Sequence, residues 1–98
     1  MKQIRFALLR HGVTAWNTEK RIQGRTDISI RPETAAWYRQ HRLPAMWANV
    51  PWFSSPLSRT RETADALGIR TVATEPAFIE MDWGTWEGQK LSDLRARM

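Results

Sequence analysis

Strand, loop and helix signals follow one another in residues 50–69, VPWFSSPLSRTRETADALGI. The apolar run over residues 50–54 predicts a short strand, and Ser55-Pro56 opens a loop. Residues 58–67 predict a helix that Gly68 ends, because the position after a C-cap favours a left-handed backbone. This stretch therefore predicts a strand-loop-helix unit.

The N-terminal residues have the same layout. Ile4, Phe6 and Leu8 alternate with shorter or polar residues, which predicts a buried strand that stops at His11. A short helical turn is expected over residues 13–19. Strands that alternate with helices predict an α/β fold with a mainly parallel sheet. Because ligands bind at the carboxyl ends of such strands, we expect the loops after both strands to converge on one crevice.

Proline, glycine and apolar periodicity predict the other segments. They are a polar loop over 20–29, a helix over 32–43, an extended edge segment over 71–79, a loop over 80–88 and an amphipathic helix from 91 to 98.

Length and composition limit the functional classes. The 98 residues, 42% of them hydrophobic, fit one domain over residues 1–98. The chain has no cysteine, so it offers no disulfide and no thiolate metal ligand. The N-terminus lacks the apolar core of a signal peptide, and no apolar stretch approaches the roughly 20 residues that span a bilayer. We therefore expect a soluble, cytoplasmic protein that does not bind membranes.

The net charge of +5 raises the question of nucleic acid. The basic residues are scattered among acids, however, and no recognition module with a readable signature is present. Nucleic acid is therefore not an expected partner. A small anionic substrate explains some of the arginines equally well.

Three blocks of sequence carry the chemistry. They are RHGVTAWN at residues 10–17, SSPLSRTRETA at residues 54–64 and EMDWGTWEG at residues 80–88. In this order they resemble the histidine phosphatase superfamily, also called phosphoglycerate mutase-like, over residues 4 to about 95. The resemblance implies the N-terminal portion of a three-layer α/β/α fold with a mainly parallel sheet. It also implies catalysis through a phosphohistidine, for which neither metal nor cofactor is expected.

The resemblance assigns a role to five residues. His11 looks like the nucleophile that becomes phosphorylated. Arg10 and Arg59 look like the guanidinium pair of the phosphate pocket, and Asn17 like a further donor to phosphate. Glu80 looks like the acid that protonates the leaving oxygen.

These residue types suit phosphoryl transfer. The transferred group spreads negative charge over its oxygens, and arginine offers a planar, permanently charged fork to bind them. A neutral imidazole is available near pH 7, and a neighbouring carbonyl or carboxylate can fix its tautomer so that the free nitrogen faces phosphorus. A carboxylic acid in apolar surroundings can protonate an alkoxide, and Glu80 is flanked by Ile79, Met81 and Trp83.

Other side chains compete for these roles. Asp82 and Glu87 are alternatives to Glu80 as the acid, and we interpret Glu87 as structural. Arg61 lies two residues from Arg59 and points to a different helix face, which predicts a solvated charge.

The chain has two histidines, His11 and His41. A structural loop histidine is the alternative interpretation of His11, whereas His41 is expected to be solvated on a polar helix face. Members of the superfamily carry a second pocket histidine in the C-terminal half, and this chain has no counterpart. We expect a fragment or truncated gene product rather than a short inactive relative, and poor stability and weak activity for the isolated chain.

The expected activity is hydrolysis of a small phosphorylated metabolite, because residues 83–88, WGTWEG, look like the phosphatase branch. Phosphoglycerate mutase-type transfer is one alternative, and a relative that binds phosphate without turnover is another. The sequence selects no particular phosphomonoester and no oligomeric state.

Overall fold

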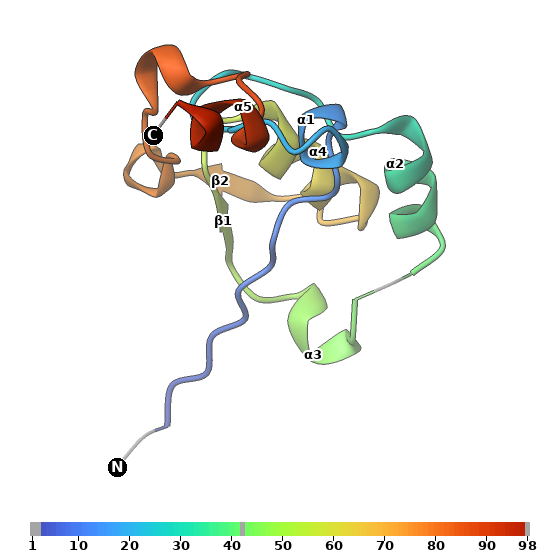
Figure 1. Cartoon of the computed structure of the whole chain (residues 1–98). Coiled ribbons are helices and arrows are strands. Elements are labelled where there is room, and N and C mark those ends of the chain that lie inside the picture. Colours follow the sequence, from blue (N-terminus) through green and yellow to red (C-terminus); the bar gives the residue numbers. More distant parts are fainter. Residues whose placement is uncertain (1–2, 42, 98) are drawn as a thin grey trace.

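The structure is a computed structural model that describes residues 3–41 and 43–97. Figure 1 shows two strands near the middle of the molecule, with helices above them and to the side. The elements are, in order, α1 (Ala15–Thr18), α2 (Pro32–Arg39), α3 (Ala45–Ala48), β1 (Trp52–Ser54), α4 (Ser58–Ala66), β2 (Val72–Thr74), the 3-10 helices η1 (Pro76–Phe78) and η2 (Gly84–Trp86), and α5 (Leu91–Ala96).

The β1-α4-β2 unit forms the centre of the fold. β1 and β2 pair in parallel, with Trp52 beside Val72 and Ser54 beside Thr74. Gly68 follows α4 with a φ of +81°, a left-handed conformation that a Cβ atom disfavours. The predicted α/β class and parallel pairing are confirmed, and so is the helix ended by Gly68.

The helix predicted over residues 32–43 is shorter than expected. α2 begins at Pro32 and ends at Arg39, because the His41 side chain competes for its last turn. The His41 Nδ1–H group donates to the Trp37 carbonyl over 2.6 Å, and the two rings stack with centroids 3.7 Å apart. His41 is exposed, as predicted, but it follows the end of α2 and does not lie on a helix face. A further short helix, α3, which the sequence did not predict, follows Pro44.

The prediction of a buried strand before His11 is wrong. Residues 3–10 form no strand, and Ile4, Phe6 and Leu8 are 77%, 82% and 98% exposed. Figure 1 shows this segment running away from the rest of the molecule to the N-terminus. The radius of gyration, 15.6 Å, exceeds the roughly 13 Å expected for a compact chain of this length. An apolar alternation becomes a buried strand only when another strand shares its hydrogen bonds, and the named sheet of the described residues contains β1 and β2 alone.

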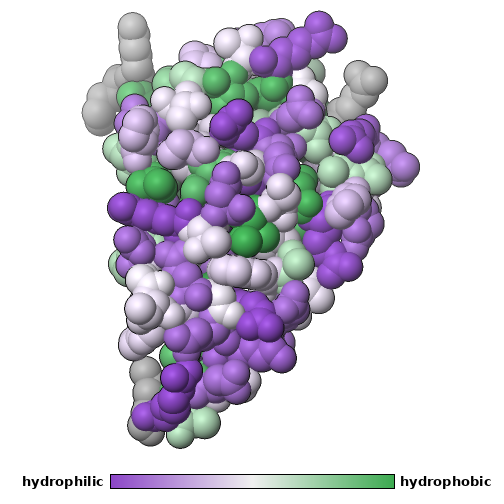
Figure 2. Space-filling view, turned by 90° about the horizontal axis from the view of Figure 1, so that it is seen from above, coloured by the Kyte–Doolittle hydropathy of each residue, from purple (hydrophilic) through white to green (hydrophobic). Residues whose placement is uncertain are grey.

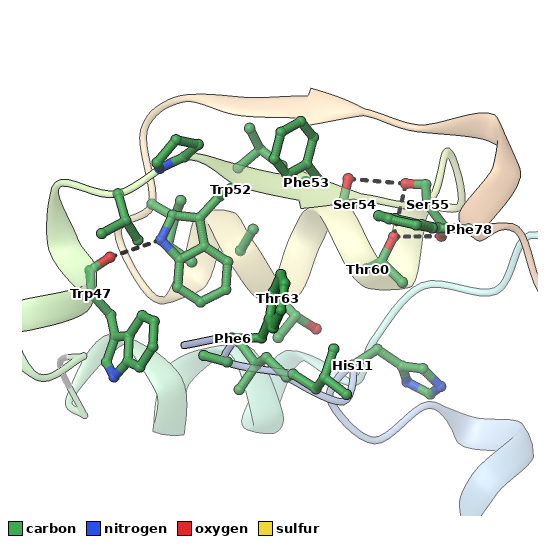
Figure 3. A pocket seen from close by; sticks show the side chains of 18 of the residues that line it. Phe6, His11, Trp47, Trp52, Phe53, Ser54, Ser55, Thr60, Thr63 and Phe78 are labelled. Carbon is green, nitrogen blue, oxygen red and sulfur yellow. Dashed lines mark hydrogen bonds between the residues drawn. The ribbon is translucent and has the colours of Figure 1, made fainter. Parts of the chain in front are cut away.

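An apolar cavity of about 780 Å³ separates the N-terminal segment from β1 and α4. Figure 3 shows Phe6 on one side of it and Trp52 and Phe53 on the other. His11 lies at its edge, and its ring points away from the cavity. The His11 ring therefore serves a site outside this apolar cavity.

Two of the remaining predictions need correction. The extended segment predicted over 71–79 is a strand only at β2, because Pro76 begins η1. The last helix, α5, ends at Ala96, and residue 98 lies outside the described residues. Among the helices of the described residues, none is long and apolar enough to cross a membrane.

The buried side chains that the structure describes are half apolar and half polar or charged. Ile30, Leu57, Ala64 and Ala66 are the apolar members. Thr14, Ser55, Arg59 and Thr63 are buried as well, and of the described side chains Arg59 and Thr14 are the largest that are fully buried. Figure 2 shows mostly hydrophilic side chains on the face above, with hydrophobic ones gathered near its middle. Most of the buried polar residues lie at the candidate site.

Candidate active site

His11 lies where the N-terminal segment meets α4. The N–H of Gly12 donates to Thr63 Oγ1 over 2.7 Å, and Thr63 Oγ1 donates to the Arg59 carbonyl over 2.7 Å. Thr63 and Arg59 are one helical turn apart, so the Thr63 hydroxyl connects the Gly12 N–H to the Arg59 carbonyl. This contact fixes the backbone beside His11 to α4.

The imidazole of His11 has a defined tautomer. Its Nδ1 lies 2.7 Å from the Gly12 carbonyl oxygen. A carbonyl can only accept, so Nδ1 carries the proton and Nε2 of the neutral ring has a free lone pair. Burial is the largest influence and lowers the pKa of His11 below 6.5. The charges of Arg59 and Arg10 lower this pKa further, whereas the Gly12 hydrogen bond and Glu80 oppose the shift.

Arg59 lies beneath the surface rather than in an open pocket. It is 1% exposed, and its guanidinium donates to the carbonyls of Thr26, over 3.0 Å, and Gly24, over 2.5 Å. Its Nε is buried and has no partner within residues 3–41 and 43–97. Burial lowers the pKa of Arg59, and the carboxylate of Glu80 opposes this shift. The guanidinium nevertheless stays charged near neutral pH.

Residues 24–27 cover Arg59, and this segment is held at both ends. Asp27 accepts hydrogen bonds from the N–H and hydroxyl of Ser58, over 2.7 and 2.8 Å, at the start of α4. These bonds lower the pKa of Asp27 below 3.8. At the other end, Gly24 packs so tightly that a Cβ atom there would lie 2.5 Å from the Met81 carbonyl oxygen.

The three candidate acids differ in their contacts. Glu80 is exposed, so the apolar enclosure expected around it is absent, and Met81 is itself 61% exposed. Asp82 accepts from the N–H of Gly84 over 2.9 Å. Hydrogen bonds from Thr26, the hydroxyl first, lower the pKa of Glu87 to about 2. Glu87 is therefore ionised at neutral pH, and its oxygens are engaged with Thr26 and Trp83.

Arg10 and Asn17 belong to the loop and helix after the N-terminal segment. Arg10 is exposed, whereas Asn17 is half-buried. The Asn17 side-chain oxygen accepts from the N–H of Thr14 over 3.0 Å, and Thr14 Oγ1 accepts from the N–H of Asn17 over 3.2 Å. This reciprocal cap starts α1. It uses the carboxamide oxygen, so the amide nitrogen is the part of Asn17 suited to donate to an anion.

The structure thus gathers Arg10, Arg59 and Glu80 within electrostatic reach of His11. Arg61 is exposed. Sequence reasoning gave no role to Thr63, although Thr63 lies within the second block and one turn from Arg59. Within the described part of the chain, no three His, Cys, Asp or Glu side chains are grouped so as to hold a metal ion.

The sequence and structure are similar to those of known proteins. Residues 6–98 match the family described as the histidine phosphatase superfamily (branch 1). A probable phosphoglycerate mutase of Yersinia pestis is 37% identical over 95 residues, which cover 89% of this chain and 42% of that protein.

Two solved structures are similar as well. A phosphoglycerate mutase from Thermus thermophilus has a TM-score of 0.75 and 37% identity, covering 90% of this chain and 50% of that one. A phosphoserine phosphatase from Entamoeba histolytica, in complex with 3-phosphoglyceric acid, has a TM-score of 0.72 and 32% identity. The match covers 87% of this chain and 44% of that one. The chain therefore spans about half the length of the relatives that it matches. The predicted phosphoglycerate mutase-like fold is confirmed.

Proposed function

This chain belongs to branch 1 of the histidine phosphatase superfamily, and we propose that it carries a phosphoryl-transfer site with His11 as the nucleophile and small phosphomonoesters as substrates. The observation that carries the proposal is the hydrogen bond from His11 Nδ1–H to the Gly12 carbonyl. It leaves the Nε2 lone pair free, and the lowered pKa keeps the ring neutral near pH 7.

The proposed reaction has two steps. Nε2 of His11 attacks phosphorus, the bond from phosphorus to the ester oxygen breaks, and Glu80 gives a proton to the departing alkoxide. In hydrolysis, water then attacks the phosphohistidine, its proton returns to the Glu80 carboxylate, and inorganic phosphate leaves His11. We assign the proton to Glu80 on position, because its side chain is accessible to a substrate and, among the described residues, only one of its oxygens accepts a hydrogen bond, from the N–H of Met81. Both oxygens of Glu87 are occupied by hydrogen bonds from Thr26 and Trp83.

The positive charges support the same proposal. Arg10 is the exposed guanidinium of the site and can bind phosphate oxygens through its fork. Arg59 is buried and contributes its positive charge without reaching the surface. Its buried Nε lacks a partner among the described residues. The Asn17 amide is proposed as a further donor.

Hydrolysis of a small phosphorylated metabolite is the proposed activity of the whole protein. Transfer to a second hydroxyl is the other candidate, since a relative 37% identical to this chain is named a probable phosphoglycerate mutase. The two reactions share the phosphohistidine and differ in the acceptor that attacks it.

A labelling experiment tests the nucleophile. The protein is incubated with a ³²P-labelled generic phosphomonoester and quenched, and phosphate that is stable in alkali but labile in acid is measured. We expect label on the wild type and on His41→Ala, the matched control in the other histidine. His11→Ala should carry none. Label that persists in His11→Ala would overturn the assignment, and binding without label in any variant would favour the non-catalytic alternative.

Acceptor competition separates the two reactions. The phosphorylated protein is mixed with water alone or with a phosphoglycerate acceptor. Release of inorganic phosphate at the same rate in both supports hydrolysis. Capture of the label as a bisphosphorylated product supports the mutase alternative.

A further inference from the structure

Glu87 joins two loops that meet above Arg59. One carboxylate oxygen accepts from the N–H of Thr26 over 2.7 Å and from the Thr26 hydroxyl. The other oxygen accepts from the N–H of Trp83 over 3.2 Å. Both oxygens are therefore used to hold backbone and side chain in place, and residue 87 spans the gap between the two loops.

The held segment in turn determines where Arg59 lies. Thr26, whose N–H donates to Glu87, also contacts Arg59. Its carbonyl accepts from the Arg59 guanidinium over 3.0 Å. The Gly24 carbonyl accepts from the same guanidinium. Hydrogen bonds thus connect Glu87 through Thr26 to Arg59. The Arg59 carbonyl in turn accepts from Thr63 Oγ1, which accepts from the N–H of Gly12, the neighbour of His11. The positive charge of Arg59 lowers the pKa of His11.

We propose that Glu87 is a positioning residue of the His11 site, which holds segment 24–26 so that its carbonyls fix the place of the Arg59 guanidinium. This inference rests on the proposed phosphate site but does not require Glu87 to touch the substrate.

A carboxylate is the group that this position needs. It faces three donors, the Thr26 N–H, the Thr26 hydroxyl and the Trp83 N–H. A glutamine amide would offer one acceptor oxygen and would turn its NH₂ group toward the remaining donors, so one set of bonds would be lost. Tight packing transmits the loss, because Gly24 has no spare room against Met81 and Glu87.

Glu87→Gln could change the pKa of His11 in two ways, by removing the charge of Glu87 or by releasing Arg59. The two effects have opposite signs. Removing the charge of Glu87 would by itself lower the pKa of His11, because one nearby negative charge is gone. Releasing Arg59 raises this pKa, since a positive charge that lowers it moves away. Glu80 and Arg10 also influence the pKa of His11, and the substitution leaves the charge of both in place.

The experiment is an NMR titration of the His11 ring in the wild type and in Glu87→Gln. We expect the midpoint to rise in the variant. The control is Glu33→Gln, which removes the same charge from exposed α2 and should leave the midpoint unchanged. A midpoint that falls or does not move in a folded Glu87→Gln protein overturns the proposal.

A second variant covers the case in which Glu87→Gln does not fold. Thr26→Val removes the hydroxyl bond to Glu87 and changes no charge. It should raise the His11 midpoint in the same direction by a smaller amount. If the His11 midpoint does not rise in Thr26→Val, this result alone contradicts the proposal.

Phosphate affinity supplies an independent readout that needs no turnover. Binding of inorganic phosphate, followed by calorimetry, should weaken about tenfold in Glu87→Gln, as for the loss of one hydrogen bond. In an Arg59→Lys background the same change should have no further effect. A full tenfold loss in that background shows that Glu87 does not act through Arg59. A wild type that binds no phosphate contradicts the proposed function, whereas the titration still decides the role of Glu87.

Discussion

Replacing Thr63 with valine tests how the loop of His11 is anchored. Thr63 is 2% exposed, and its hydroxyl accepts from Gly12 and donates to the Arg59 carbonyl. Valine keeps the volume but leaves the buried Gly12 N–H without a partner, which costs about 1–3 kcal/mol. At about 4–8 °C per kcal/mol for a chain of this size, Tm falls by roughly 4–24 °C.

Urea unfolding measures this loss. We expect the midpoint of Thr63→Val to fall with an unchanged slope. Thr63→Ser keeps the hydroxyl and should lose only about 1 kcal/mol for the buried methyl group. Thr85→Val, at an exposed position in η2, should change the free energy of unfolding by less than about 0.5 kcal/mol. If Thr63→Val is as stable as Thr85→Val, the hydroxyl does not anchor Gly12.

Three further measurements follow from the structure. Gly68→Ala should lower the stability by about 1 kcal/mol in thermal unfolding, because its φ is +81° and no atom lies within 4 Å to compensate or clash. The pKa of His11 is lowered, so its contribution is fully present above pH 6.5 and lost as pH falls through the folded pKa; the stability of His11→Ala should lack this dependence. The pKa of Asp27 is lowered by Ser58, so Asp27→Asn should be less stable than the wild type at pH 7, and the difference should vanish as pH falls below 3.8.

Local signals predicted a large part of the fold. The helix before Gly68 and the strand before Ser55 were predictable because turn residues and helix ends act within a few residues of sequence. α2 ended earlier than predicted because the ring of His41 bonds the Trp37 carbonyl. No propensity argument contains that side-chain contact.

The site was predictable in composition and less so in arrangement. The resemblance of the three blocks to the histidine phosphatase superfamily pointed to His11, Arg59 and Glu80. The burial of Arg59 and the exposure of Glu80 were not predicted, because both depend on how residues 24–26 and 80–87 pack against α4. The role of Thr63 depends on a contact between residues 51 positions apart.

The sequence by itself determined the family, the parallel β1-α4-β2 unit and the residue types of a phosphate site, because each of these rests on short patterns of side chains. Tertiary structure decided the rest. Residues 4–9 have the alternation of a buried strand, yet they lie unpaired because a strand needs a neighbour to share its hydrogen bonds. Likewise, the place of Arg59 is set by two carbonyls that a distant carboxylate, Glu87, holds above it.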